Sequence, residues 1–393
     1  MLIDSDIYKM ELSIFFDPLQ EDQFKSHSDG SLFGSNIKTF TSTFPDLEKI
    51  SVALIGLTED RGTKTNKGVA LAVTEIRKKL YALKKGTVKL QTADLGNLRN
   101  GETLEDTYSR IKEVCELLMQ MDILPVFIGG SQDLTFGQFL SYENTGKVIS
   151  MLNVDAFIDM SGNREDQSKH HIHRVLVHQP NILFNYSHLG YQTYLNDQEV
   201  VNVLEKLHFE TYRVGRIRES IEDMEPVVRE ADLISFDLTA IKQADAPGNK
   251  NSQPFGLTAE EACTLCWYAG LSTKLTSIGF YEFNPEEDVK GQTAGVVATM
   301  IWYFVEGYYN RKPDFDFQSD EYAKYIVTMK NNPQRIVFYK HKFTEKWWME
   351  VPFPIEKSKY ARVSVIPCSY SDYEIATKGE LPTRWITTHA KLI

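Results

Sequence analysis

The sequence has few cysteines and no long apolar run, and both shortages narrow the class of protein. Four cysteines in 393 residues are too few for the disulfide framework of a small secreted domain. No apolar run approaches the roughly 20 residues that a helix needs to span a bilayer, and the N-terminus has no basic segment followed by an apolar core. We therefore expect a cytoplasmic protein without a membrane span.

The sequence also lacks a run of lysine or arginine, and its formal net charge is -11. A protein that binds nucleic acid through phosphate contacts needs a basic surface, so this charge argues against that function. Cys263 and Cys266 form a CxxC pair, but no second pair of cysteines or histidines follows at zinc-finger spacing. We interpret this pair as part of the packing of a helix.

Apolar runs of strand length alternate with segments of helical periodicity between residues 51 and 310. We expect strands at residues 51–57, 87–97, 124–130, 148–154, 182–190, 208–215, 231–238 and 274–283. We expect helices at residues 66–81, 104–121, 134–142, 197–207, 258–270 and 293–309. This alternation predicts an α/β fold of three layers, in which helices cover both faces of a mostly parallel sheet.

The segments on either side of this α/β domain differ from it. Residues 1–50 are mixed in composition, and we expect an N-terminal extension that wraps around the main domain. Residues 311–393 are rich in aromatic residues and proline, which predicts a C-terminal appendage with strands at 335–341 and 361–367 and one helix at 320–329. The aromatic side chains either bind a protein partner or fasten the appendage to the main domain, and the sequence leaves both open.

The centre of the predicted sheet is the run KVISMLNVDAFIDM, from Lys147 to Met160. Its first half reads as a strand buried on both faces, and its second half places Asp155 and Asp159 beyond the carboxyl end of that strand. Ligands bind at this end of the strands in open α/β sheets, so both carboxylates are candidates for holding a hard cation or a cationic substrate. The alternative is that both side chains cap the turn that follows.

Four predicted strand ends together carry a specific pattern. They read GGSQD at residues 129–133, DAFID at 155–159, SFDLT at 235–239 and EFNP at 282–285. In order and context these motifs resemble those of the arginase, agmatinase and formiminoglutamase family, the ureohydrolases, over roughly residues 50 to 310. Members of that family commonly form trimers or hexamers, so the resemblance also implies a homo-oligomer.

The resemblance implies a site with two manganese ions, which activate a bridging water to attack a guanidinium or formimino carbon. The family pattern is GGDH, DAHxD and SxDxD, and three of its six ligand positions are altered in this sequence. The altered positions are Gln132, Phe157 and Thr239, and the retained ligands are Asp155, Asp159 and Asp237. Two ions held close together need more ligands than these. We therefore expect either no metal or a single Mn²⁺ or Mg²⁺ on the three carboxylates.

The resemblance also suggests residues that bind the substrate and transfer protons. In the family, the residue matched by Glu282 receives the cationic end of the substrate, and we expect Asn284 to share in substrate binding. A loop histidine transfers protons in the family. The candidates here are His170, His171, His173 and His178, of which we select His171. The alternative is that these histidines belong to an exposed polar loop.

The neighbours of the predicted site add two further expectations. Asp133 follows Gln132 and either supplies another carboxylate to the site or caps the next helix. Buried carboxylates without a cation repel one another, so they take up protons or attract a positive group. We expect the pocket to bind a single cation or to be closed by a basic side chain from the nearby loops, for which the candidates are Arg164, Lys169 and Lys242.

Two interpretations of the function follow from these residues. The first, which we favour on the sequence alone, is a ureohydrolase-fold protein that has lost two-manganese catalysis and serves as a binding or assembly component, with the extensions supplying surface for a protein partner. The second is a divergent metal-dependent hydrolase of a small guanidino or formimino compound, in which Glu282 holds the substrate cation.

Overall fold

The computed structural model of the chain describes residues 12–20, 29–162, 164–312, 316–330, 335–352 and 365–392. A 10-stranded sheet forms its middle layer, with the strand order β1-β4-β3-β5-β10-β9-β6-β7-β8 and with β2 paired to β4. The strands are β1 Phe16–Asp17, β2 Lys38–Thr39, β3 Val52–Leu57, β4 Thr92–Leu98, β5 Leu124–Ile128, β6 Ile149–Val154, β7 Leu183–Tyr191, β8 Glu210–Arg213, β9 Leu233–Asp237 and β10 Ser277–Tyr281. Strands β3 to β10 pair in parallel, whereas β1 runs antiparallel to β4.

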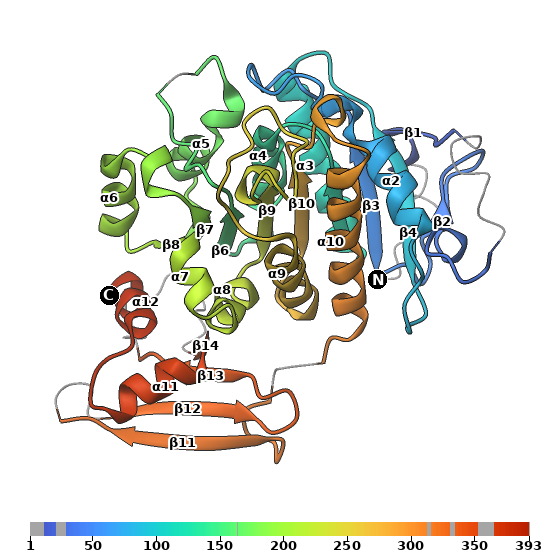
Figure 1. Ribbon diagram of the computed structural model, residues 1–393. Coiled ribbons are helices and arrows are strands. Elements are labelled where there is room, and N and C mark those ends of the chain that lie inside the picture. The colour runs from blue at the N-terminus through green and yellow to red at the C-terminus, as the bar shows by residue number, and fades with distance from the viewer. Residues whose placement is uncertain are drawn as a thin grey trace.

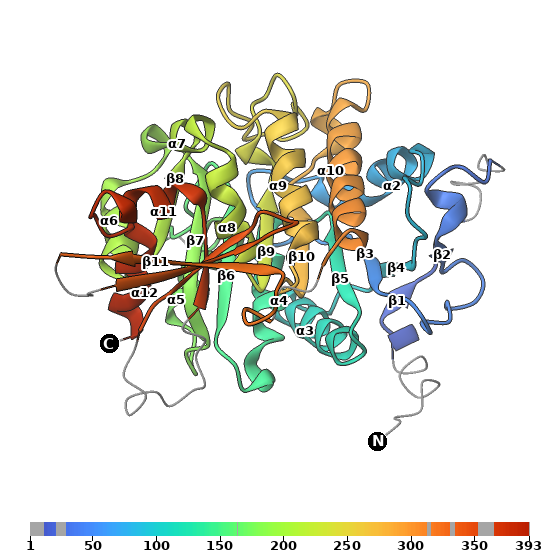
Figure 2. The ribbon, with the colours of Figure 1, turned by 90° about the horizontal axis from the view of Figure 1, so that it is seen from below.

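Helices cover both faces of this sheet (Figure 1). They are α2 Ala72–Ala82, α3 Leu104–Gln120, α4 Thr135–Leu140, α5 His171–Val177, α6 Gln198–Lys206, α7 Val214–Glu219, α8 Glu225–Arg229, α9 Ala259–Leu271 and α10 Gln292–Tyr309. Seen from below in Figure 2, α2, α9 and α10 lie on one face, and α3 and α4 lie on the other. The predicted three-layer α/β fold is therefore confirmed.

The central strands lie where they do because they are apolar on both sides. Every residue of β3, β5, β6, β9 and β10 is buried, which is typical of parallel strands between two helical layers. One apolar core joins the sheet to α2, α8, α9 and α10, and a second joins it to α3 through α6. The polar side chains in these strands are therefore exceptions that need a partner, and two of them, Asn153 and Asp237, lie at or next to a carboxyl end.

Local signals fix the ends of the long helices. Thr103 begins α3 and Thr258 begins α9, each in a capping box in which the threonine hydroxyl accepts a hydrogen bond from the amide three residues later. The N-terminal extension adds β1 and β2 to the outer strand β4, so in this part it extends the sheet as well as lying against it.

The C-terminal appendage is a separate four-stranded sheet with two helices, which lies below the main domain (Figure 1). Its elements are β11 Tyr322–Thr328, β12 Arg335–His341, β13 Trp347–Glu350, β14 Val365–Cys368, α11 Tyr370–Thr377 and α12 Thr383–Leu392. The predicted helix at 320–329 is wrong, because Tyr322–Thr328 within this segment pairs with β12 as a strand. Its tyrosine, isoleucine, valine and threonine residues favour a strand once a partner is present.

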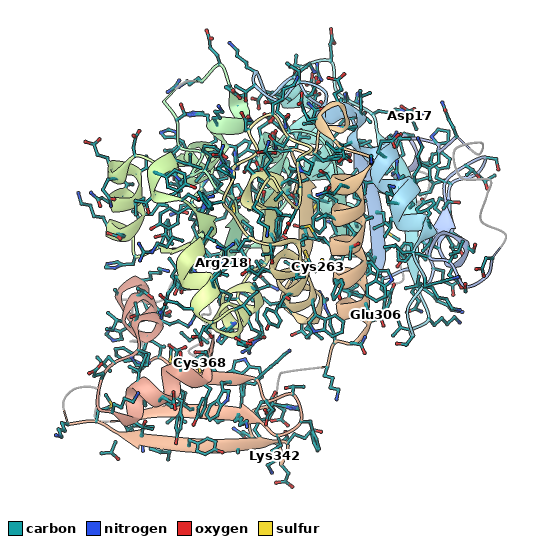
Figure 3. The ribbon with its side chains drawn as sticks, in the orientation of Figure 1. Asp17, Arg218, Cys263, Glu306, Lys342 and Cys368 are labelled. Carbon is teal, nitrogen blue, oxygen red and sulfur yellow. The ribbon has the colours of Figure 1, made fainter. Side chains whose placement is uncertain are left out.

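The predicted strand at 335–341 is present, whereas the first residues of the one expected at 361–367 lie outside the described residues. Side chains from both units meet where the appendage joins the main domain. Arg229 of α8 stacks on Trp348 at 4.3 Å and donates a hydrogen bond to the carbonyl of Trp347. Cys368, at the end of β14, lies at the same junction (Figure 3). Trp347 and Trp348 thus contact the main domain, which agrees with one of the two interpretations for these two residues. No helix among the described residues is long and apolar enough to cross a membrane.

Candidate metal centre

The candidate site lies where β5, β6, β9 and β10 end side by side. After β5 the chain turns through Gly129 and Gly130, whose φ angles of 86° and 77° lie in the left-handed region that glycine adopts without strain. This turn brings Gln132 back over the strand ends. Asp155, Asp159, Asp237 and Glu282 are buried around it, as the motifs predict.

Two of the three aspartates use one carboxylate oxygen to hold the local turn. Asp155 Oδ1 accepts hydrogen bonds from the Phe157 amide at 2.9 Å and from Thr239 Oγ1 at 2.7 Å. Asp237 Oδ1 accepts one from the Thr239 amide at 2.6 Å. The expected turn-capping role is therefore present for Asp155, whereas among the described residues no such bond is seen for the Asp159 side chain. The second oxygens of the carboxylates turn toward a common point.

The side-chain amide of Gln132 lies at that common point. One of its two terminal atoms is 2.9 Å from Asp155 Oδ2 and 3.1 Å from Oδ2 of both Asp159 and Asp237. The other terminal atom is 2.9 Å from Asn153 Oδ1 and 3.2 Å from Ser235 Oγ. The sequence identified Gln132 as a lost ligand, but its side chain still fills the position that the three carboxylates face.

The electrostatics of this cluster are unbalanced. Burial raises the pKa of Asp155 to about 6, and burial together with the neighbouring carboxylates raises the pKa of Asp159 and Asp237 well above the usual range. Among the described residues, no lysine or arginine forms an ion pair with these three groups. The cluster therefore has an excess of negative charge that a proton or a cation has to offset.

The expected closure by a basic side chain is wrong for the described residues. Lys242 forms its ion pair with Asp245 at 3.4 Å, and Arg164 is exposed to solvent. The group that approaches the carboxylates is the neutral amide of Gln132 instead. An amide fits in this narrow space because Gln132 stands directly beyond the turn of β5, whereas the basic residues lie on loops further out.

The residues present do not fit a centre of two metal ions. Phe157 offers no ligand atom, and Thr239 uses its hydroxyl and its amide to donate hydrogen bonds to Asp155 and Asp237. The oxygens of those aspartates that a second ion needs are therefore already occupied by donors. As the side chains stand, the Gln132 amide occupies the point that the three carboxylates face, and no group of three or more His, Cys, Asp or Glu side chains among the described residues is placed to hold a metal ion. One divalent cation could take these hard oxygen ligands only with the amide displaced.

Glu282 adjoins the aspartates and has strained backbone geometry. Its φ angle of 68° is rare for a residue with a side chain, and such strain gathers at functional sites. Its Oε1 accepts a hydrogen bond from the backbone N–H of Gln132 at 2.9 Å, and its Oε2 accepts one from Asn66 Nδ2 at 2.8 Å. Burial raises the pKa of Glu282 to about 7.

Asn284 lies close to Glu282, but its side chain is engaged within the protein. Its Nδ2 donates to Asn66 Oδ1 at 3.2 Å and to the carbonyl of Lys67 at 2.8 Å, and its Oδ1 accepts from the amide of Glu286. Asn66 thereby links Asn284 to Glu282. In this geometry Asn284 holds the loop that supports Glu282, and its predicted contact with substrate stays a prediction.

His171 is the one loop histidine that lies beside the cluster. Its Nδ1 is 2.8 Å from the carbonyl of Ser168 and 3.9 Å from Asp159 Oδ2, and its buried Nε2 has no hydrogen-bond partner among the described residues. Burial lowers the pKa of His171 to about 3, so the imidazole is neutral. His170 stacks on His173 at 4.7 Å, and His178 Nε2 lies 2.7 Å from Glu143, so these three have other neighbours.

Asp133 is not a helix cap, so that expectation is wrong. It lies inside a short 3₁₀ turn, Gln132–Leu134, and accepts a hydrogen bond from Tyr108 Oη at 2.5 Å. Because the preceding residue is directed at the aspartates, Asp133 points away from them, toward Gly62. Burial raises the pKa of Asp133 to about 6.

Sequence reasoning missed the partners that hold these groups in place. Asn153 and Ser235 contact Gln132, and Asn66 contacts Glu282. His188 of β7 lies 3.0 Å from the carbonyl of Asp155 and 2.8 Å from Tyr186 Oη. The available signal was the presence of polar residues inside strands that are otherwise apolar, because a buried polar side chain needs a partner.

Comparison with known proteins agrees with this fold. The model of the arginase family matches residues 50–306. Formimidoylglutamase of Staphylococcus aureus (strain MSSA476) is 26% identical over 300 residues, which are 68% of this chain and 91% of the relative. Formimidoylglutamase of Streptococcus gordonii is 22% identical over 284 residues, which are 66% of this chain and 85% of the relative.

Solved structures give the same picture of the fold. The structure of Trypanosoma cruzi formiminoglutamase with Mn²⁺₂ has a TM-score of 0.64 and 19% identity, and the match covers 72% of this chain and 99% of that one. The structure of formimidoylglutamase from Bacillus subtilis has a TM-score of 0.66 and 20% identity, over 75% of this chain and 97% of that one.

Proposed function

Because this chain belongs to the arginase family, we propose that it hydrolyses a small linear amidine of the formimino or guanidino kind with one divalent cation, Mn²⁺ or Mg²⁺. The names of the relatives, formimidoylglutamases, support a formimino compound as the first substrate to try. They also favour the hydrolase over the non-catalytic binding component that we favoured on the sequence alone.

The cation would be held by Asp155, Asp159 and Asp237, whose second oxygens face one point. The chemistry that such a cation would supply there is the activation of water as a nucleophile at neutral pH. The chain's own part is to hold the carboxylates of Asp155 and Asp237 in place before the substrate arrives. The Phe157 backbone amide and the hydroxyl and backbone amide of Thr239 do so by donating hydrogen bonds to the other oxygen, Oδ1, of each carboxylate.

The substrate would be oriented by Glu282, because an ionised carboxylate attracts the cationic amidine. Asn66 Nδ2 and the backbone N–H of Gln132 keep this carboxylate in place, and the side chain of Asn284 supports Asn66. We assign proton transfer to His171, because it is neutral, its Nε2 is unpartnered among the described residues, and its Nδ1 lies 3.9 Å from Asp159.

The observation that carries this proposal is the convergence of three buried carboxylates, with which no lysine or arginine of the described residues forms an ion pair. The test is the release of ammonia, urea or formamide from formiminoglutamate, agmatine, guanidinobutyrate and arginine in the presence of Mn²⁺. We expect turnover of at least one of these substrates by the wild type, and loss of turnover in Asp237→Asn. A protein that binds the cation and turns over none of the four substrates would contradict the hydrolase.

A second function has one specific observation in its favour. If the nitrogen of the Gln132 amide faces the aspartates, it donates hydrogen bonds to them and occupies the cation position. The chain would then be a binding or assembly component, as the first interpretation of the sequence states. Absence of bound Mn²⁺ together with absence of turnover is the result that this alternative expects.

Other expectations stay proposals beside this one. A homo-oligomer, a protein partner that binds through the extensions, and a cytoplasmic location are each expected from the sequence. Size-exclusion chromatography with light scattering measures the oligomer directly, and a monomer would contradict that expectation.

A further inference from the structure

Strand β11 forms the outer edge of the appendage sheet, whose strand order is β11-β12-β13-β14. The opposite edge, β14, contacts α8 of the main domain, whereas β11 is the strand furthest from that domain (Figure 1). Among the described residues, β12 is the only strand that pairs with β11. The free edge of a sheet presents a row of unpaired backbone groups, to which another strand can bind.

The hydrogen bonds to β12 identify the backbone groups of β11 that point outward. The N–H of Lys342 donates to the carbonyl of Glu321 at 2.8 Å, so the residue just before β11 directs its carbonyl toward β12. In an antiparallel ladder this direction alternates from one residue to the next. The N–H and C=O groups of Lys324, Ile326 and Thr328 therefore point away from β12, toward the open edge.

This edge lacks the features that usually prevent pairing with another strand. Its pairing with β12 continues without a bulge from Tyr322 to Thr328, and the strand contains neither proline nor glycine. Its one charged residue is Lys324, whose ammonium lies 5.5 Å from the centre of the Tyr339 ring. Because Tyr339 stands opposite Lys324 on β12, this charge lies over the protein's own sheet and not across the edge. Ile326 is 56% exposed, which suits contact with another strand.

The sequence around β11 is complementary to itself in the antiparallel direction. When two copies of the strand run antiparallel about a two-fold axis at Tyr325, the two Tyr325 side chains face each other, and Lys324 faces Ile326 of the second copy. The exposed Asp320, before the strand, then faces the exposed Lys330, after it. Aromatic pairs and opposite charges stabilise neighbouring strands, so this alignment favours a second copy as the partner.

We propose that β11 pairs with β11 of a second copy of this chain, so that the two appendages form one continuous antiparallel sheet. The main domain leaves room for this pairing, because it lies on the opposite side of the appendage (Figure 1). The interaction does not depend on the proposed hydrolysis. It gives the homo-oligomer that the sequence leads us to expect a contact surface outside the α/β domain.

Replacement of Ile326 by proline tests the pairing. Proline lacks the N–H that points outward at this position, so Ile326→Pro removes a hydrogen bond between the two copies and keeps the bonds to β12. We expect this variant to halve the mass of the wild-type assembly, measured by sedimentation equilibrium of the full-length protein. Ile326→Val keeps the N–H and the branched side chain, so this matched control should keep the wild-type mass. A thermal melt checks that each variant is folded.

An exchange of two charges tests whether the partner is a second copy. Lys330→Asp places a carboxylate opposite Asp320 of the second copy, at both ends of the paired strands. We expect this variant to associate about tenfold more weakly than wild type, because like charges replace opposite ones. Asp320→Lys combined with Lys330→Asp restores opposite charges, and should bring the association constant back to within about threefold of wild type.

The remaining outcomes overturn the proposal. A wild type that stays monomeric at the highest soluble concentration does so, as does an assembly whose mass is unchanged in a folded Ile326→Pro. If Ile326→Pro does not fold, the charge variants decide. Association of Lys330→Asp as tight as that of wild type, or no recovery in the double variant, overturns the alignment and with it the second copy as the partner. Turnover is measured separately, so none of these results bears on the proposed hydrolase.

Discussion

Two buried clusters of charge in this protein differ in how they are balanced. At the junction between the main domain and the appendage, Arg384 lies 3.7 Å from both Glu210 and Asp372. At the strand ends, Asp155 and Asp237 lie together with a neutral amide, and no lysine or arginine in the part of the chain that the structure describes forms an ion pair with them. Each cluster is largely shielded from water, so the difference does not arise from exposure.

The two clusters therefore differ in role: the junction cluster belongs to the fold, whereas the strand-end cluster is a candidate site for a ligand. At the junction each carboxylate lies within ion-pair distance of Arg384, so opposite charges offset one another within the chain, although Arg384 Nε has no hydrogen-bond partner among the described residues. Like charges at the strand ends lower the stability of the chain, and such an arrangement persists where a ligand makes up the missing charge.

The largest effect is expected from Arg384→Met at the junction. Glu210 and Asp372 would keep their charges without the cation between them, and breaking a buried pair in this way costs about 3 to 5 kcal/mol. Urea unfolding of the full chain measures the loss. Lys378→Met on the exposed surface of the same appendage is the matched control, with an expected change below about 0.5 kcal/mol. Equal stability of the two variants would contradict the balanced junction.

The strand-end cluster should respond in the opposite direction. Asp237→Asn removes one of the repelling charges and keeps the oxygen that caps Thr239, so we expect the metal-free protein to gain about 1 kcal/mol in its free energy of unfolding. The same variant should lose Mn²⁺ binding. Thermal unfolding in a chelator measures the gain, and a loss of stability there would show that the carboxylates are already neutralised within the chain.

Restoring the lost half of the metal centre should change the number of ions bound. Phe157→His with Thr239→Asp supplies an imidazole and a carboxylate and removes the hydroxyl donor to Asp155. We expect the double variant to bind two Mn²⁺ per chain, measured by elemental mass spectrometry. The single variant Thr239→Val, which removes only the hydroxyl, should still bind one Mn²⁺ per chain. A double variant that still binds one ion would show that other features exclude the second.

The smallest effect concerns Lys391, whose Nζ hydrogen-bonds Asn185 at the same junction. Burial lowers the pKa of Lys391 to about 8 from about 10.5. The unfolded chain therefore binds more protons between these values, and the stability of the wild type rises with pH across that window. The stability of Lys391→Met lacks this rise with pH. The free energy of unfolding of the variant should therefore exceed that of the wild type below pH 8, and the difference should shrink toward pH 10.5. Parallel stability curves would contradict the lowered pKa.

The sequence predicts the main sheet well, because strands buried on both faces are apolar along their whole length. It also predicts which aspartates meet, since the carboxyl ends of parallel strands share one edge. The appendage is harder to predict. Tyr322–Thr328 has residues that favour a strand, but the charged and polar residues around it also suit a helix, and only pairing with β12 decides between them.

Within the site, the residue types could be predicted but their hydrogen bonds could not. Gln132 was identified as an altered ligand position, yet nothing in the sequence shows that its amide lies between three carboxylates and two strand residues. The expected closure by Lys242 failed for a related reason. A lysine on a loop pairs with the nearest carboxylate, and Asp245 lies closer along the chain than the buried cluster does.

The central claim is that this chain retains one cation position of the family's two. The most direct measurement is the amount of Mn²⁺ per chain, by elemental mass spectrometry after incubation with Mn²⁺ and gel filtration, for the wild type and Asp237→Asn. The account predicts one ion in the wild type and none in the variant. Two ions in the wild type, or none, would contradict it.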